Sequence, residues 1–169
     1  MARNVEIKAR IANVEKLAPR VAELADSGPF EMLQDDTFFA CAGGRLKLRI
    51  FSYTEGQLIF YRRPDVAGPK ESFYLISPTT SPRTLLEVLS LAYGQIGRVK
   101  KHRTLFSIGR TRVHLDCVED LGHFLEFEVV LVDDEPADAG AAIVHDLLDQ
   151  LGISPGQLIE GAYLDLLQA

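Results

Sequence analysis

The amino-acid sequence predicts an α+β fold in which eight antiparallel strands close into a barrel, with helices packed around it. About eight segments alternate between polar and apolar residues with period two, as strands with one buried face do. The polar faces of two of these segments, 45–50 and 122–131, carry charges of one sign instead of a mixture of polar side chains. The connections are short and turn-forming, and 169 residues suffice for one domain spanning residues 1–169.

The first expected strand shows the pattern clearly. In residues 4–11, NVEIKARI, one face carries Asn4, Glu6, Lys8 and Arg10, and the other face is apolar. The remaining strands are expected at 34–40, 45–50, 58–63, 71–76, 100–108, 110–116 and 122–131.

Single strands in this set carry charge of one sign. Residues 45–50, RLKLRI, place Arg45, Lys47 and Arg49 on one face without an acid, and residues 122–131 place Glu126 beside Glu128 without a base. Like charges on one face repel, so something must compensate them. Residues 45–112 hold 13 of the 18 Lys and Arg but only 4 of the 24 acids. This segregation indicates a basic site for an anion.

Four helices are expected between and after the strands. One spans 13–26, with Pro19 as an internal point where it could kink or split. Ser81 and Pro82 open the second, which ends at Gly94. The third spans 136–151, and Ser154-Pro155 opens the last.

Composition excludes several classes of protein. No apolar run approaches the roughly 18 residues of a membrane span. Charges stand where a signal peptide would be apolar, so we expect a cytoplasmic protein. Cys41 and Cys117 form no CxxC pair, which favours free thiols. Net charge −6 and the acidic remainder of the chain argue against nucleic acid as a partner.

An interior lined by both signs of charge needs a ligand that supplies both. Phosphate oxygens pair with Lys and Arg, and carboxylates bind Mg²⁺ or Mn²⁺ together with phosphate oxygens. The sequence therefore predicts a barrel interior that binds a polyanion with divalent metal.

The chain resembles the CYTH superfamily, which joins class IV adenylyl cyclases and thiamine triphosphatases. The family hallmark ExExK corresponds to NVEIK at 4–8, with Asn4 at the first glutamate. Further matching segments follow in order, namely GRLKLR at 44–49, LIFYRRP at 58–64, VKKHR at 99–103 and HLDCVEDLGHFLEFE at 114–128. The resemblance covers nearly the whole chain and implies a closed eight-stranded barrel called a triphosphate tunnel.

The resemblance also implies roles for single residues. The metal ligands would be Glu6, Asp116, Glu126 and Glu128, and the catalytic residues Glu6, Lys8, Glu126 and Glu128. The triphosphate would be bound by Lys8, Lys47, Arg49, Arg62, Lys101, Arg103 and Arg112. Arg112 and Lys70 are equally well read as plain surface or tunnel-mouth charges, Arg10 and Arg45 could lie at the mouth, and His114 is read as structural. Asn4 is neutral, so one metal position could be lost or altered.

Three functions are compatible with these residues. The first, favoured by LIFYRRPDVAGPKES, LGHFLEFEVVL and AYLDLL, is a class IV adenylyl cyclase-like conversion of ATP to cyclic AMP and pyrophosphate. The second is hydrolysis of tripolyphosphate or an organic triphosphate, because the sequence shows no adenine pocket. The third is a non-catalytic binder of a phosphorylated ligand. Neither a membrane nor a nucleic acid is expected as a partner, and an exposed apolar helix face could support a homodimer.

Overall fold

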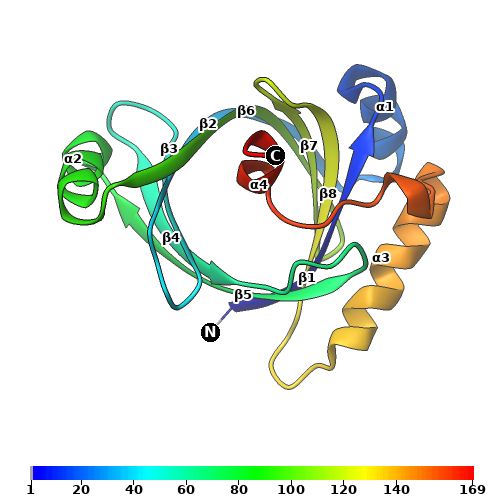
Figure 1. Cartoon of the computed structure of the whole chain (residues 1–169). Coiled ribbons are helices and arrows are strands. Elements are labelled where there is room, and N and C mark those ends of the chain that lie inside the picture. Colours follow the sequence, from blue (N-terminus) through cyan, green and yellow to red (C-terminus); the bar gives the residue numbers. More distant parts are fainter. Residues whose placement is uncertain (1) are drawn as a thin grey trace.

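The structure is a computed structural model that describes residues 2–169, and its centre is an eight-stranded antiparallel sheet rolled around a central space (Figure 1). The strands are β1 (Ala2–Ile11), β2 (Ser27–Phe39), β3 (Arg45–Ile50), β4 (Gly56–Arg62), β5 (Lys70–Thr79), β6 (Gln95–Ile108), β7 (Thr111–Val118) and β8 (Gly122–Val130).

The paired strands form a closed ring in the order β1-β5-β4-β3-β2-β6-β7-β8. β1 completes the ring because it pairs with β5 on one side and with β8 on the other, antiparallel in both cases. On β1, Glu6 lies opposite both Lys70 of β5 and Glu128 of β8. The predicted α+β class and eight antiparallel strands are confirmed, and the ring of hydrogen bonds agrees with a barrel.

Helices cover the outside of the sheet and one of its ends. The helices are α1 (Val14–Leu24), α2 (Pro82–Tyr93), α3 (Ala137–Leu151) and α4 (Tyr163–Leu167), with a 3₁₀ turn η1 (Pro155–Gln157). Figure 1 shows α1 and α3 on one side of the barrel, α2 on the opposite side, and α4 within the ring itself.

The main core lies between the outer face of the barrel and two helices. Outward-facing residues such as Ile7 of β1 and Phe127 of β8 pack with Val144 and Leu148 of α3 and with Val21 of α1, and all are buried. The apolar faces of the strands therefore point outward to the helices, as expected, and their charged faces point inward.

Some elements differ from the sequence prediction. β2 begins at Ser27, well before the predicted residue 34, because Gly28-Pro29 and a register shift interrupt the alternation there. Pro19 does not end α1. The expected last helix divides into η1 and α4, with residues 158–162 between them in no helix.

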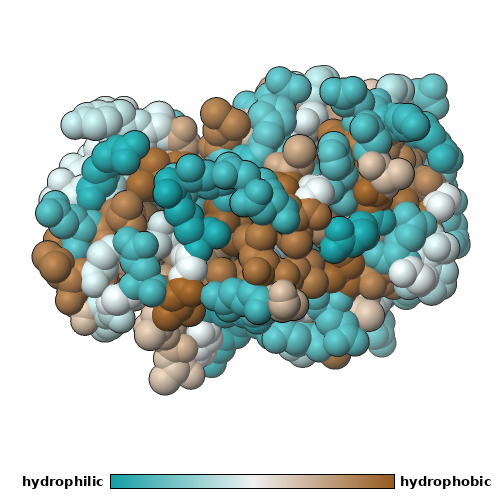
Figure 2. All heavy atoms as spheres, turned by 45° about the horizontal axis from the view of Figure 1, so that its top comes forward, coloured by the Kyte–Doolittle hydropathy of each residue, from teal (hydrophilic) through white to brown (hydrophobic). Residues whose placement is uncertain are grey.

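Apolar residues also reach the surface. On the face shown in Figure 2, they gather toward the centre and hydrophilic residues surround them. No helix among residues 2–169 is long and apolar enough to cross a membrane. The expected homodimer stays a prediction.

Candidate active site

The barrel encloses a cavity of about 320 Å³, lined by all eight strands and by the start of α4. Seven bases and four acids line it, so its wall carries a formal surplus of positive charge. The bases are Lys8, Lys47, Arg49, Arg63, Lys101, Arg103 and Arg112, and the acids are Glu6, Asp36, Glu126 and Glu128. Such a wall suits a polyanion.

Helix α4 forms the floor of this cavity. Tyr163 packs in one apolar cluster with Phe38, Val99 and Phe124, which face inward from three different strands. Lys8 of β1 lies over the Tyr163 ring, with its Nζ 4.1 Å from the ring centroid. The C-terminal segment thus covers one end of the barrel, as Figure 1 shows.

The other end of the cavity is a more exposed mouth. Inward-facing residues recur every second position along a strand. On β2 they run from Phe38 beside α4 through Asp36 to Met32, and on β6 from Val99 through Lys101 to Leu105. The cavity thus has a largely charged or polar middle and then a mouth, formed by Asn4, Met32, Phe51, Gln57, Tyr74, Ile76, Leu105, Arg112 and Glu128.

A cluster of potential metal ligands lies on β7 and β8. His114, Glu126 and Glu128 each offer one ligand atom, and these atoms lie within 4.8 Å of one another. Burial alone would raise the pKa of Glu126, but Lys8, His114 and Arg103 together hold it well below its usual range. The pKa of Glu128 is also lowered against its burial, with His114 as the largest favourable influence. Both carboxylates are therefore ionised at neutral pH.

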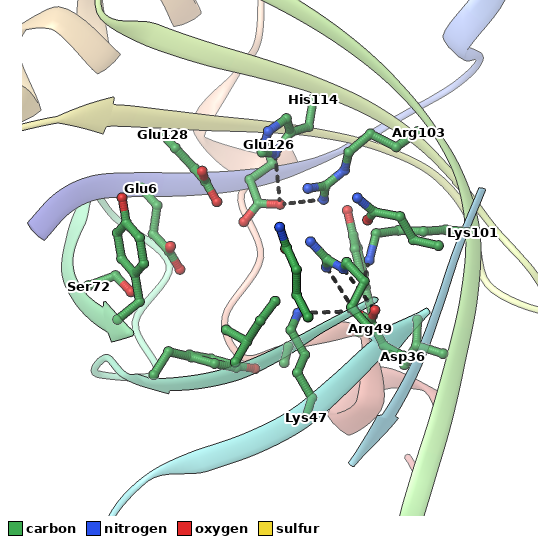
Figure 3. Close-up of a pocket in the computed structure, with 18 of the residues that line it drawn as sticks. Glu6, Asp36, Lys47, Arg49, Ser72, Lys101, Arg103, His114, Glu126 and Glu128 are labelled. Carbon is green, nitrogen blue, oxygen red and sulfur yellow. Dashed lines mark hydrogen bonds and ion pairs between the residues drawn. The ribbon is translucent and has the colours of Figure 1, made fainter. Parts of the chain in front are cut away.

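Glu6 of β1 faces the same space as this cluster (Figure 3). Its Oε1 lies 2.7 Å from Nη1 of Arg63, the residue after β4. Burial raises the pKa of Glu6 to about 7, and repulsion from Glu126 adds to the shift, so the pairing with Arg63 offsets it only in part. Glu6 consequently titrates near neutral pH.

The opposite wall is basic and surrounds one carboxylate, Asp36 (Figure 3). Arg49 donates from Nε and Nη2 to the two oxygens of Asp36, each at 2.8 Å. The amine of Lys47 lies 3.0 Å and that of Lys101 3.4 Å from Asp36 Oδ2. Burial lowers the pKa of Lys47 to about 8 and that of Lys101 to about 7, with Arg49 contributing repulsion.

Arg103 connects the acidic cluster to a further buried carboxylate, that of Asp116. Its Nε and Nη2 donate to Asp116 at 2.7 and 2.8 Å, and Nη2 also donates to Glu126 at 3.1 Å. The Tyr163 hydroxyl donates to Asp116 Oδ2 at 2.7 Å. Although burial would raise it, the pKa of Asp116 falls to about 2 because of Arg103. Asp116 is thus a fully enclosed anion.

Most of the site residues expected from the sequence are brought together in the cavity. These are Glu6, Lys8, Lys47, Arg49, Lys101, Arg103, Arg112, Glu126 and Glu128. Lys70 is buried, with its amine 2.7 Å from the Val66 carbonyl oxygen, and Arg10 is exposed over the Phe124 ring. Arg45 pairs with Asp65 and with Asp165 of α4.

Two of the expected site residues lie outside the cavity lining. Arg62 is exposed over the rings of Phe60 and Phe73, and Arg63 faces the cavity instead. Asp116 does not line the cavity, because Arg103 and Tyr163 occupy its oxygens, and His114 stands in the potential metal cluster in its place. His114, read as structural from the sequence, therefore faces the site.

Sequence reasoning missed Asp36, Arg63 and Tyr163. Asp36 had a signal, because it shares the inward phase of the predicted strand 34–40 with Gln34 and Phe38. Arg63 had no usable signal, since both faces of LIFYRR are apolar and end in arginine. Tyr163 lies in a short terminal helix whose docking place no local pattern indicates.

The donor set fits a divalent cation. His114 Nδ1 is buried, lies 3.6 Å from Glu126 Oε2 and has no hydrogen-bond partner within residues 2–169. The side-chain oxygen of Asn4 is likewise buried and unpartnered within the part of the chain that the structure describes. A buried polar atom left unpaired is costly, so these atoms are poised for a ligand. Two carboxylates and an imidazole are a common ligand set for metals.

Comparisons with known proteins show what the chain is similar to. The family model of the CYTH domain matches residues 2–163. Adenylate cyclase CyaB of Aeromonas hydrophila is 25% identical over 173 residues, covering 96% of this chain and 87% of that protein. The PH1012 protein of Pyrococcus horikoshii OT3 superposes with a TM-score of 0.85 at 23% identity, over 96% of this chain and 98% of that one. The candidate adenylyl cyclase HpAC1 of Hippeastrum, which reveals a dominant triphosphatase activity, superposes with a TM-score of 0.65 at 15% identity, over 99% and 94% of the two chains.

Proposed function

The chain belongs to the CYTH domain family, and from this premise we propose that it is a divalent-metal-dependent enzyme that cyclises ATP to 3′,5′-cyclic AMP and pyrophosphate, in the manner of class IV adenylyl cyclases. The barrel interior would then be a triphosphate tunnel. The relative in Aeromonas hydrophila that carries the name adenylate cyclase supports this reaction.

One observation carries the proposal above all others. A largely buried cluster of two acids and a histidine, Glu126, Glu128 and His114, faces a wall of Lys47, Arg49 and Lys101 in a single cavity. Phosphate oxygens would pair with the cations, and the carboxylates would hold Mg²⁺ or Mn²⁺. Glu6 is placed to add a further carboxylate. Binding an anion alone would need no such acids.

The residues of this chain would bind and orient the substrate. Lys8, Lys47, Arg49, Lys101 and Arg103 would hold the triphosphate in the charged middle of the tunnel by paired hydrogen bonds. A cation bound by Glu126, Glu128 and His114 would lower the pKa of the attacking hydroxyl and neutralise charge on the leaving group.

The orientation of the bound ATP would supply the rest of the rate enhancement. The ribose 3′-oxygen attacks the α-phosphorus, the bond from that phosphorus to the β-phosphate oxygen breaks, and the hydroxyl proton passes to solvent. The wall fixes the α-phosphorus in line with the attacking and leaving oxygens. Pyrophosphate leaves among the remaining cations.

The mouth of the tunnel favours a substrate with an organic group. Met32, Phe51, Ile76 and Leu105 line it, and Tyr74 adds an aromatic ring. Apolar and aromatic side chains suit the face of a nucleobase and have nothing to offer an inorganic phosphate chain. With the base at the mouth, the α-phosphorus would lie closer to Glu128 and His114 than the γ-phosphorus does.

Hydrolysis of tripolyphosphate or of an organic triphosphate is the second candidate. It would use the same cations but deliver water to a terminal phosphorus. The likeness to HpAC1, with its dominant triphosphatase activity, favours keeping hydrolysis as a candidate.

Several other expectations stay predictions. These are the single domain of residues 1–169, the cytoplasmic location, the homodimer and the absence of nucleic-acid and membrane partners.

A phosphorus NMR time course tests the reaction. Purified protein would be mixed with ATP, or separately with tripolyphosphate, in the presence of Mg²⁺ or Mn²⁺. We expect a cyclic phosphodiester signal together with pyrophosphate from ATP, and no turnover once EDTA is added. Orthophosphate as the main product would establish hydrolysis instead.

The variant Glu126→Gln provides the control for the metal cluster. It removes one ligand and one charge, so turnover should fall by at least a hundredfold, while the circular dichroism spectrum is kept. A near-normal rate would contradict the assignment of Glu126. Turnover of neither ATP nor tripolyphosphate by the native chain would contradict the proposed function as a whole.

A further inference from the structure

The carboxylate of Asp36 lies inside the basic wall, where a phosphate-binding site would be expected to exclude an acid. It is buried on β2 and contacts three cations, Lys47, Arg49 and Lys101. None of the roles proposed above for metal or triphosphate uses it. Its position therefore needs an explanation of its own.

Asp36 cannot easily move aside for a ligand. Its side chain is short and leaves a strand that is paired with β3 and β6 on both sides. Arg49 grips both of its oxygens in a two-point contact, the geometry in which Arg and carboxylate bind most strongly. A bound triphosphate would therefore add to Asp36 rather than replace it.

The three cations keep donors for a phosphate while they hold Asp36. An ammonium has three N–H donors and a guanidinium has five. Lys47 and Lys101 each use one contact on Asp36, and Arg49 uses two. Each therefore retains at least two donors that can turn toward the cavity.

The same cations repel one another and lose hydration in the cavity. The side chain of Lys101 is 2% exposed and that of Lys47 is 14% exposed. Burial lowers the pKa of both amines, to about 7 for Lys101 and about 8 for Lys47, and nearby Arg49 and Arg103 lower them further. Asp36 acts in the opposite direction for both amines.

No other group near these amines takes over the role of Asp36 as their counter-ion. The charged or titratable groups around these amines include Lys8 of β1, Asp36 of β2, Arg49 of β3, Tyr61 of β4, Arg103 of β6, Asp116 of β7 and Tyr163 of α4. Asp116 is already held by Arg103 and Tyr163, and both tyrosines have a raised pKa and are neutral. Among residues 2–169, only Asp36 forms ion pairs with both amines.

We propose that Asp36 is a positioning residue for triphosphate binding, a permanent counter-ion that favours the charged forms of Lys47 and Lys101 and holds them with Arg49 against one wall. This inference rests on the proposed function for the identity of the ligand. It goes beyond that function because it assigns an acid to anion binding.

The test measures binding of inorganic tripolyphosphate by calorimetry in EDTA, from pH 6 to pH 8.5, so that turnover plays no part. In Asp36→Asn the amines lose their counter-ion and release their protons at lower pH. The dissociation constant of the variant should be within about twofold of the native value at pH 6. It should be at least about tenfold weaker at pH 8.5, since one unit of pKa corresponds to a factor of ten.

Asp35→Asn is the matched control, because Asp35 is the next residue, lies outside the cavity lining and pairs with exposed Arg98. It should bind like the native chain at every pH. If the ratio of the dissociation constant of Asp36→Asn to that of the native chain did not change with pH, the inference would be overturned. Tighter binding at every pH would also overturn it, since it would make Asp36 a competitor of the ligand.

A second variant does not depend on whether Asp36→Asn folds. Lys101→Arg places a guanidinium, which keeps its proton, beside the native Asp36. It should retain affinity at pH 8.5 better than the native chain does. If Lys101→Arg and the native chain lost affinity equally at pH 8.5, the role proposed for the charge of Lys101 would be overturned. If the native chain bound no tripolyphosphate at any pH, the proposed function would fail together with this inference, whereas native binding with unchanged variants would reject the role of Asp36 alone.

Discussion

At the scale of single residues, one step along β4 decides which arginine reaches the cavity. Arg63 lies 2.7 Å from Glu6 and its side chain is 3% exposed, whereas Arg62 stands outside over two phenylalanine rings. Removing one partner of a buried ion pair leaves the other charge uncompensated, which costs about 3 kcal/mol. An exposed arginine over an aromatic ring contributes about 0.5–1 kcal/mol.

The two arginines therefore make a matched pair of variants. Arg63→Ala should destabilise the metal-free protein by about 3 kcal/mol near pH 8, and Arg62→Ala by less than about 1 kcal/mol. The pKa of Glu6 is raised, so Glu6 is neutral at low pH and becomes charged as pH rises through about 7. The loss in Arg63→Ala should therefore shrink toward pH 5.5.

Urea unfolding at pH 5.5 and pH 8 measures both effects. Equal and small losses for the two variants would show that Arg63 does not pair with Glu6. A loss in Arg63→Ala that stays the same at both pH values would mean that Glu6 keeps one charge state between them.

At the scale of elements, α4 is a five-residue helix that gains its stability from docking and not from its length. Gly97 of β6 makes room for it, because a Cβ atom at this position would collide with Leu164. Tyr163 then attaches the helix to Asp116 on β7 by the hydroxyl hydrogen bond. The last residues of the chain thus determine the shape of the tunnel floor.

Tyr163→Phe removes that hydrogen bond and little else. A hydrogen bond to a charged, buried partner contributes about 2 kcal/mol, so the free energy of unfolding should fall by about that amount. Tyr53→Phe removes an equivalent hydroxyl from a residue that is 77% exposed, and should change stability by less than about 0.5 kcal/mol. Equal stability of the two variants in urea unfolding would show that Tyr163 does not hold the floor in place.

At the scale of the whole molecule, the barrel gives the cavity two unlike ends. Helix α4 covers one end, charges fill the middle, and apolar residues together with polar and charged ones line the other end. This order arises because inward-facing residues recur at every second position along each strand that crosses the tunnel. A ligand with a charged tail and an apolar head would be bound in one direction only.

This direction can be tested at the mouth. Phe51→Ala should raise the KM for ATP about fivefold, corresponding to about 1 kcal/mol of lost aromatic contact, and leave the KM for tripolyphosphate unchanged. Leu33→Ala, on an exposed residue of β2, is the control and should change neither value. An equal rise for both substrates would place the organic group of ATP elsewhere.

The sequence by itself determined the eight strands, their inward charges and most of the charged residues that line the cavity. Period-two alternation assigns a residue such as Lys47 or Glu126 to one face of its strand, and the ring of strands then brings all inward faces together. The kinds of charge also predict a polyanion with a divalent metal as the ligand.

Only the tertiary structure decided how these charges pair. Asp36 and Lys101 are 65 residues apart in the chain and meet because β2 and β6 are neighbours in the ring. Asp116 shares the inward phase of His114, yet Arg103 and the terminal Tyr163 enclose it. The alternation of a strand fixes the face of each side chain. It cannot fix which distant side chain lies opposite, because that depends on strand order and on where the chain end docks.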